Sequence, residues 1–154
     1  MILCPSVSES DPHWPERGRL EWEVRAFVDR SDGRVIDCSR DPEAAWRELL
    51  EVWERRGDLI LFLDQLALPN ERHLGELEGC PHDWCACPPS PSSLDWFRGV
   101  VKVSWRLQHR HADLVQRIGE LGPFARHWAW LPAALGHALR ERHVSGPHLH
   151  HPLP

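Results

Sequence analysis

The sequence predicts an α+β fold, in which a mostly antiparallel sheet of about four strands is covered by helices. Residues 59–63 are an unbroken apolar run between Gly57 and Pro69, which suits a strand covered on both faces. Residues 20–29 alternate between apolar and polar, which is typical of a strand with one buried face. Apolar residues recur at helical spacing within 42–56. We therefore expect the order β-β-α-β-loop-β-α-α.

The first two strands are expected to form a hairpin. Residues 20–29 lead into Asp32-Gly33, a dipeptide that favours tight turns, and residues 35–38 provide a short returning strand. Residues 1–18 precede this hairpin, are rich in proline and serine, and have no apolar period. They are predicted to be an irregular lead-in.

The clearest predicted helix covers residues 42–56 and leads directly into the central strand. Asp41 can cap its first turn, Pro42 fits the first helical position, and Gly57 fits the position after its last turn. We expect this helix to cover one face of the sheet.

The second half of the chain begins with a long segment rich in proline and cysteine, residues 69–93, which is predicted to be a loop containing a short helical turn near 71–77. A strand over 94–105 follows. Two helices are then expected near 111–121 and 124–139, separated by Gly122-Pro123, on the other face or at one end of the sheet. Residues 144–154 are predicted to be a loose tail of histidine and proline, so that residues 1–154 form a single domain.

Charge and composition narrow the classes of function. The chain has 154 residues and a net charge of −5, with −6 in residues 41–79 and +4 in residues 95–154. The acidic half argues against binding nucleic acid over the whole surface. There is no basic, apolar leader and no apolar run of about 20 residues, so we expect a cytoplasmic protein without a membrane span.

A metal site is the best candidate for chemistry. Three thiols and one imidazole lie within eight residues, and thiolate and imidazole are the ligands that zinc prefers. The gap between the last two cysteines is shorter than in common zinc motifs, so Cys38 or a histidine of the tail could replace one local ligand. The alternative is a set of ordinary thiols, with Trp84 packing the loop onto the body. The predicted zinc ligands are Cys80, His82, Cys85 and Cys87.

Two other groups of polar residues could form functional sites. Asp64 follows the central strand, where Glu71, His73 and Asp83 could join it to hold a hard cation or act as acid and base. Arg106 and Arg110 could bind an anion. In both cases the simpler interpretation is a solvated polar surface.

For function, the sequence favours a small protein-binding or regulatory module of the inhibitor, immunity or adaptor type, with a structural zinc in the 80–87 segment. No motif predicts catalysis, and the nine tryptophans suit a contact surface. The acidic first half suits a basic partner protein. The alternatives are a metal-dependent hydrolase and a nucleic-acid-associated protein that uses the basic C-terminal helices. The predicted contact residues are Trp84, Arg106 and Arg110.

Overall fold

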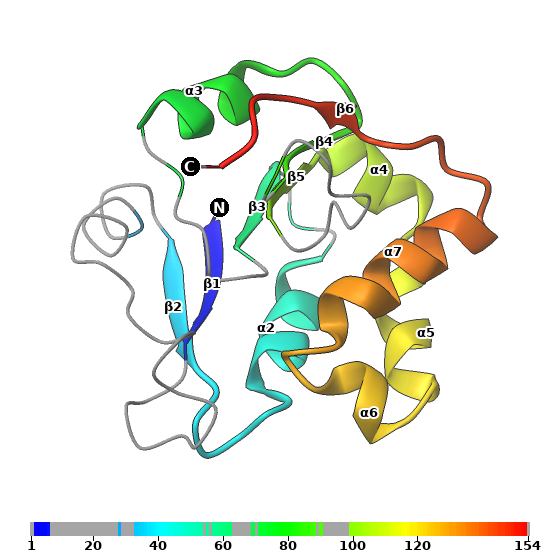
Figure 1. Cartoon of the computed structure of the whole chain (residues 1–154). Coiled ribbons are helices and arrows are strands. Elements are labelled where there is room, and N and C mark those ends of the chain that lie inside the picture. Colours follow the sequence, from blue (N-terminus) through cyan, green and yellow to red (C-terminus); the bar gives the residue numbers. More distant parts are fainter. Residues whose placement is uncertain are drawn as a thin grey trace.

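The structure is a computed structural model that describes residues 2–6, 28, 33–53, 55, 57–62, 69, 71–88, 90 and 99–153. It confirms the α+β class: helices pack on both sides of a six-stranded sheet (Figure 1). The strands are β1 (Ile2–Ser6), β2 (Arg34–Asp37), β3 (Leu59–Phe62), β4 (Trp84–Cys87), β5 (Val100–Val103) and β6 (His148–Leu149). The helices are α2 (Ala44–Val52), α3 (Glu71–Gly79), α4 (Trp105–Arg110), α5 (Leu114–Glu120), α6 (Pro123–Arg126) and α7 (Leu131–Glu141).

The sheet is mixed, with strand order β2-β1-β3-β5-β4-β6. β3 and β4 both pair antiparallel with β5, whereas β1 pairs parallel with β2 and β3, and β4 pairs parallel with β6. Parallel neighbours need long connections, and here long stretches of chain separate β1 from β2 and β4 from β6. The antiparallel character predicted from the sequence therefore holds only for the β3-β5-β4 part of the sheet.

The central strand is confirmed. β3 lies inside the sheet between β1 and β5. Leu59 and Leu61 are buried in one apolar cluster, and Ile60 is buried in another on the opposite face. Because both faces are covered, the strand has no polar alternation, which is the reason for its continuous apolar run.

The two faces of the sheet are covered differently. We call the face under α2, α4, α5, α6 and α7 the helical face; its core is aliphatic and aromatic. We call the other face, under α3 and the C-terminal segment, the cysteine face (Figure 1). The predicted helix 42–56 and the C-terminal helices therefore share one face, contrary to the expected arrangement. The cysteine face buries Val28, Ile60, Leu74, Leu77, Cys80, Cys85, Cys87, Val100 and Leu153.

Three segments predicted to be irregular contain regular structure. The lead-in 1–18 includes β1, the loop 69–93 includes β4, and the tail 144–154 includes β6, whereas α3 corresponds to the helical turn predicted near 71–77. The tail is not loose: the backbone N–H of Leu153 donates to the carbonyl of Pro88 at 2.8 Å, and its side chain is buried. These three strands are short and are stabilised by pairing with distant parts of the chain, which local sequence patterns do not report.

The described residues cover little of the predicted hairpin apart from its returning strand. Most of 20–29 lies outside the described residues, Val28 is helical, and the returning strand is β2, which pairs parallel with β1. Of the predicted strand 94–105, residues 100–103 form β5. Trp105 instead begins α4, because the Ser104 hydroxyl accepts the backbone N–H of Leu107 at 3.2 Å and caps the helix.

Tryptophan side chains connect the elements of the body. The indole N–H of Trp46 donates to the carbonyl of Val115, and that of Trp53 donates to the carbonyl of His111, both at 3.0 Å. These bonds tie α2 and the residue after it to the region of α5.

Among the helices that the structure describes, none combines the length and apolar character that a membrane span requires.

Candidate metal centre

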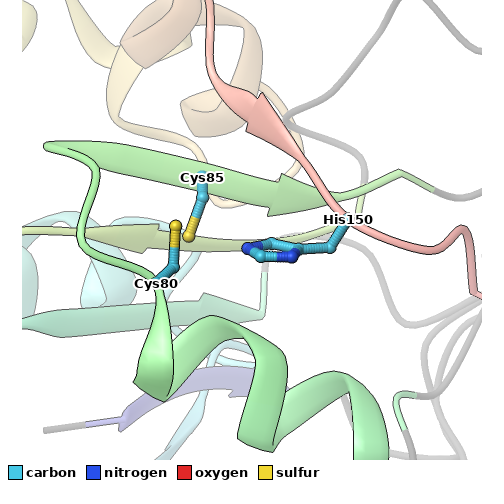
Figure 2. Close-up of side chains that lie close together, drawn as sticks. All are labelled: Cys80, Cys85 and His150. Carbon is cyan, nitrogen blue, oxygen red and sulfur yellow. The ribbon is translucent and has the colours of Figure 1, made fainter.

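Three metal-ligating side chains converge on the cysteine face. The ligand atoms of Cys80, Cys85 and His150 all lie within 4.8 Å of one another (Figure 2). Cys80 follows the last residue of α3, Cys85 is in β4, and His150 follows β6. Two thiols and one imidazole form most of a tetrahedral zinc set.

Strand pairing brings the histidine to the cysteines. β6 lies parallel to β4, with His148 opposite Cys85, and the backbone N–H of His150 donates to the carbonyl of Ala86 at 2.9 Å. The C-terminal segment is thereby held along the edge of β4. Backbone hydrogen bonds thus help to place His150 beside Cys85, which lies 65 positions earlier in the sequence.

The His150 ring is prepared for a metal. Its Nε2 atom is buried and has no hydrogen-bond partner among the described residues, while its Nδ1 lies 4.0 Å from a carboxylate oxygen of Glu76. Burial lowers the pKa of His150, and the neighbouring His148 lowers it further, so the ring is neutral at pH 7. A neutral imidazole with a carboxylate behind it is the usual arrangement of a histidine that binds zinc.

The two thiols are suited to bind a metal, and burial makes it difficult for Cys85 to ionise without one. Both side chains are buried. Burial raises the pKa of Cys85, and the adjacent Cys80 raises it further. A bound dication would supply the positive charge that two thiolates need, and its binding would release their protons. Cys80, Cys85 and Cys87 are free thiols.

Lys102 supports the turn that carries Cys80. It lies opposite Cys85 on β5, is only 3% exposed, and donates from Nζ to the carbonyls of Cys80 at 2.7 Å and Glu78 at 3.3 Å. Its charge is paired with Asp58 at 3.1 Å. The ammonium thus caps the carboxyl end of α3 and favours the thiolate of Cys85.

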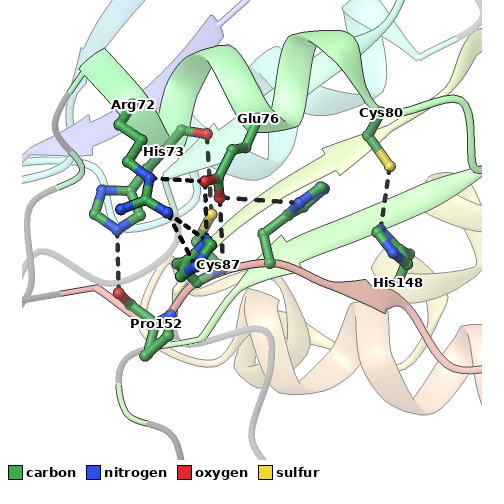
Figure 3. A network of polar contacts seen from close by, with 9 residues as sticks. Arg72, His73, Glu76, Cys80, Cys87, His148 and Pro152 are labelled. Atoms are coloured by element: carbon green, nitrogen blue, oxygen red, sulfur yellow. Dashed lines mark hydrogen bonds and ion pairs between the residues drawn. The ribbon is translucent and has the colours of Figure 1, made fainter.

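A polar network fastens the C-terminal segment to α3 (Figure 3). Glu76 accepts from Arg72 at 3.0 Å and contacts the ring of His151 at 2.9 Å. Burial alone would raise the pKa of Glu76, but the hydrogen bonds from His151 and Arg72 lower it. The ring of His73 contacts the carbonyl of Pro152 at 3.0 Å. Glu76 therefore orients two consecutive histidines, of which only His150 belongs to the cluster.

Two of the four predicted ligands are in the cluster and two are not. Cys87 lies two residues beyond Cys85 on the extended strand β4, and its thiol is not among the converging ligand atoms. Its thiol instead points toward the carbonyl of His73 at 4.0 Å, and burial raises its pKa to about 12. His82 is exposed and stacks on His148. His150 takes the third place, and the only sequence signal for it is the run of histidines in the tail.

The three predicted contact residues do not all line the same pocket in the structure. Trp84 and Arg110 line a common pocket of about 550 Å³, and Arg106 is not among the lining residues. Arg110 forms an ion pair with Asp83, and the indole N–H of Trp84 donates to the carbonyl of Ser145 at 2.7 Å. Asp64 lies outside the described residues. The predicted hard-cation group is therefore not assembled by what the structure describes: His73 and Asp83 contact other parts of the chain.

The comparisons with known proteins give no relative for this chain. No protein-family model matches the sequence, and no curated protein or solved structure is significantly similar to it.

Proposed function

We propose that this chain is a zinc-binding protein in which Cys80, Cys85 and His150 hold the ion. The observation that carries the proposal is the buried Nε2 of His150, which has no hydrogen-bond partner in the part of the chain that the structure describes and lies in a group with two thiols. An unsatisfied buried nitrogen is costly, and a metal ion would satisfy it. Thiolate and imidazole favour zinc over magnesium or calcium, which prefer oxygen ligands.

The zinc is structural in this proposal. Its ligands are buried, and they join three segments: the end of α3, the strand β4 and the residues after β6. A metal held there connects the C-terminal segment to the sheet. Free thiols at the centre suit a reducing compartment such as the cytoplasm.

Metal analysis of the purified protein tests the proposal. We expect one zinc ion per chain in the wild type, and loss of the ion in Cys85→Ser and His150→Ala. Cys87→Ser and His151→Ala are matched controls, because each removes a similar side chain close by but outside the cluster. Zinc-free wild-type protein that also fails to take up added zinc would refute the proposal. Equal loss in the controls would show that the effect is general unfolding.

A second candidate function, binding of another protein, is supported by an exposed apolar patch. Leu121, Phe124 and Trp130 are 65%, 64% and 48% exposed, and the rings of the last two stack with centroids 4.6 Å apart. Adjacent exposed aromatic side chains are typical of contact surfaces. This patch fits the regulatory or adaptor class predicted from the sequence better than Arg110, which already has an ion-pair partner.

Affinity capture with matched variants tests the second candidate. A specific partner should be recovered with the wild type and lost with Phe124→Asp and Trp130→Asp. Trp105→Asp is the control, because Trp105 is equally exposed but lies on α4, away from this patch. Equal recovery with all four proteins would contradict a role for the patch.

A further inference from the structure

His148 stands beside the three-residue cluster. Its Nδ1 atom lies 3.5 Å from the Sγ atom of Cys80. In a tetrahedral zinc site, bond lengths of about 2.3 Å to sulfur and 2.05 Å to nitrogen place these two atoms roughly 3.6 Å apart. The observed separation is therefore that of two ligands of one ion, although His148 is not within 4.8 Å of all three other ligand atoms. Its ring must move toward Cys85 and His150 to complete the set.

His148 differs from the other three residues in its surroundings. Cys80 and Cys85 are buried and the His150 side chain is only 13% exposed, whereas His148 is exposed. Its ring is held by neighbours on two sides: it stacks on His82 at a centroid distance of 4.3 Å and meets the edge of His150 at 4.7 Å. The fourth position of the site is thus filled from the surface, by a side chain that two aromatic contacts restrain.

The pocket of about 550 Å³ lies on the outer side of His148. His148 lines it, and Cys80, Cys85 and His150 do not. Of the four side chains, His148 is therefore the one that a molecule in this pocket would meet.

The charges around the pocket favour a neutral ligand. Its two guanidinium groups are already paired, Arg110 with Asp83 and Arg142 with Asp113. A zinc ion bound to two thiolates and a neutral imidazole carries no net charge, so an anion gains little there. The remaining lining is largely imidazole and indole.

We infer that His148 is the fourth and exchangeable ligand of the zinc site, and that the adjoining pocket admits a small neutral nitrogen base to the metal when His148 moves away. This inference rests on the proposed zinc site. With His148 bound, the zinc has four protein ligands and the centre is closed; with His148 displaced, one coordination position is open. Imidazole is the simplest member of the ligand class, because it reproduces the side chain that it replaces.

Cobalt substitution tests the inference, because the visible spectrum of Co²⁺ reports its ligands. The wild type should give a tetrahedral thiolate spectrum that added imidazole leaves unchanged at low concentration. His148→Ala should bind Co²⁺ with a changed spectrum and bind zinc at least about 100-fold more weakly, beyond the usual effect of losing an outer-shell partner. Imidazole should then restore the wild-type spectrum.

Two variants sharpen this test. His150→Ala removes a ligand that does not line the pocket, so imidazole should not restore its spectrum. His137→Ala removes an exposed histidine on α7 and should behave as the wild type. A His148→Ala spectrum identical to the wild type, or one that imidazole leaves unchanged, would overturn the inference while the zinc site stands. Failure of the wild type to bind Co²⁺ or zinc would overturn both.

Discussion

The two faces of the sheet are built by different means. The helical face buries leucine, isoleucine, valine and tryptophan side chains from α2 and the C-terminal helices. The cysteine face lies under α3 and the C-terminal segment, and it places thiols, histidines and a buried lysine against the same strands. The helical face is stabilised mainly by the area it buries, whereas the cysteine face depends on specific polar partners. We therefore expect the two faces to respond differently to the same kinds of change.

Removal of the metal should have the largest effect, and it should be confined to the cysteine face. At free zinc about 1,000-fold above Kd, the ion contributes about 4 kcal/mol to the free energy of unfolding. Chelation should therefore lower Tm and increase amide hydrogen exchange in β4 and residues 148–153, while α5 and α7 stay protected. Hydrogen exchange with mass spectrometry measures this. A uniform increase over both faces would contradict the comparison.

Truncation of a leucine on the helical face should give the opposite pattern. Leu135 on α7 is fully buried in the first cluster. Leu135→Ala should lower the free energy of unfolding by about 3 kcal/mol, through lost burial and the cavity left behind. Urea unfolding measures this loss, and zinc content should remain one per chain. Loss of zinc in a variant that is still folded would show that the two faces are coupled.

Substitution of two glycines by alanine tests how tightly the helices pack on the two faces. A Cβ at Gly119 on α5 would lie 2.3 Å from the Trp46 ring, so Gly119→Ala should destabilise by about 1–3 kcal/mol. A Cβ at Gly75 on α3 meets nothing within 4 Å. Gly75→Ala should therefore stabilise by about 0.5–1 kcal/mol, because alanine is the better helix former. Thermal unfolding of the two variants checks the opposite signs.

The smallest effect is expected from an ion pair on the helical side. Both guanidinium nitrogens Nη1 and Nη2 of Arg142 lie 2.8 Å from the Asp113 carboxylate, and this hydrogen bonding lowers the pKa of Asp113 from 3.8 to about 2. Because the folded-state pKa is depressed, the stabilisation is fully present above pH 3.8 and is lost as pH falls through 2. Asp113→Asn should be slightly less stable than the wild type at pH 5, and this difference should vanish near pH 2. Denaturant midpoints at both pH values test it.

The elements predicted from the sequence are those whose patterns are local. The apolar run at 59–63 and the helical spacing within 42–56 each report their own burial, and both correspond to observed elements, β3 and α2. β1 and β6 carry no such pattern, because they are short and are ordered by partners far along the chain. Their parallel pairing could not be deduced from turn signals.

The candidate site was predicted only in part, because sequence patterns identify ligands that are close together in the chain. Cys80 and Cys85 are close in sequence, so the concentration of cysteines in this segment indicates that they are metal ligands. His150 is brought to them by strand pairing, and the extended geometry of β4 separates Cys87 from Cys85. A cysteine-rich segment predicts that a metal site exists more readily than it predicts which residues form that site.

The shortness of β6 has a consequence for association between chains. β6 is the last strand in the described order and has two residues, so it offers little edge for a further strand to join. It covers β4, whose sequence Trp-Cys-Ala-Cys is wholly buried. Any event that releases residues 148–153 would uncover an apolar strand edge of the kind that templates aggregation. Self-association should therefore follow release of this segment, well before the helical face unfolds.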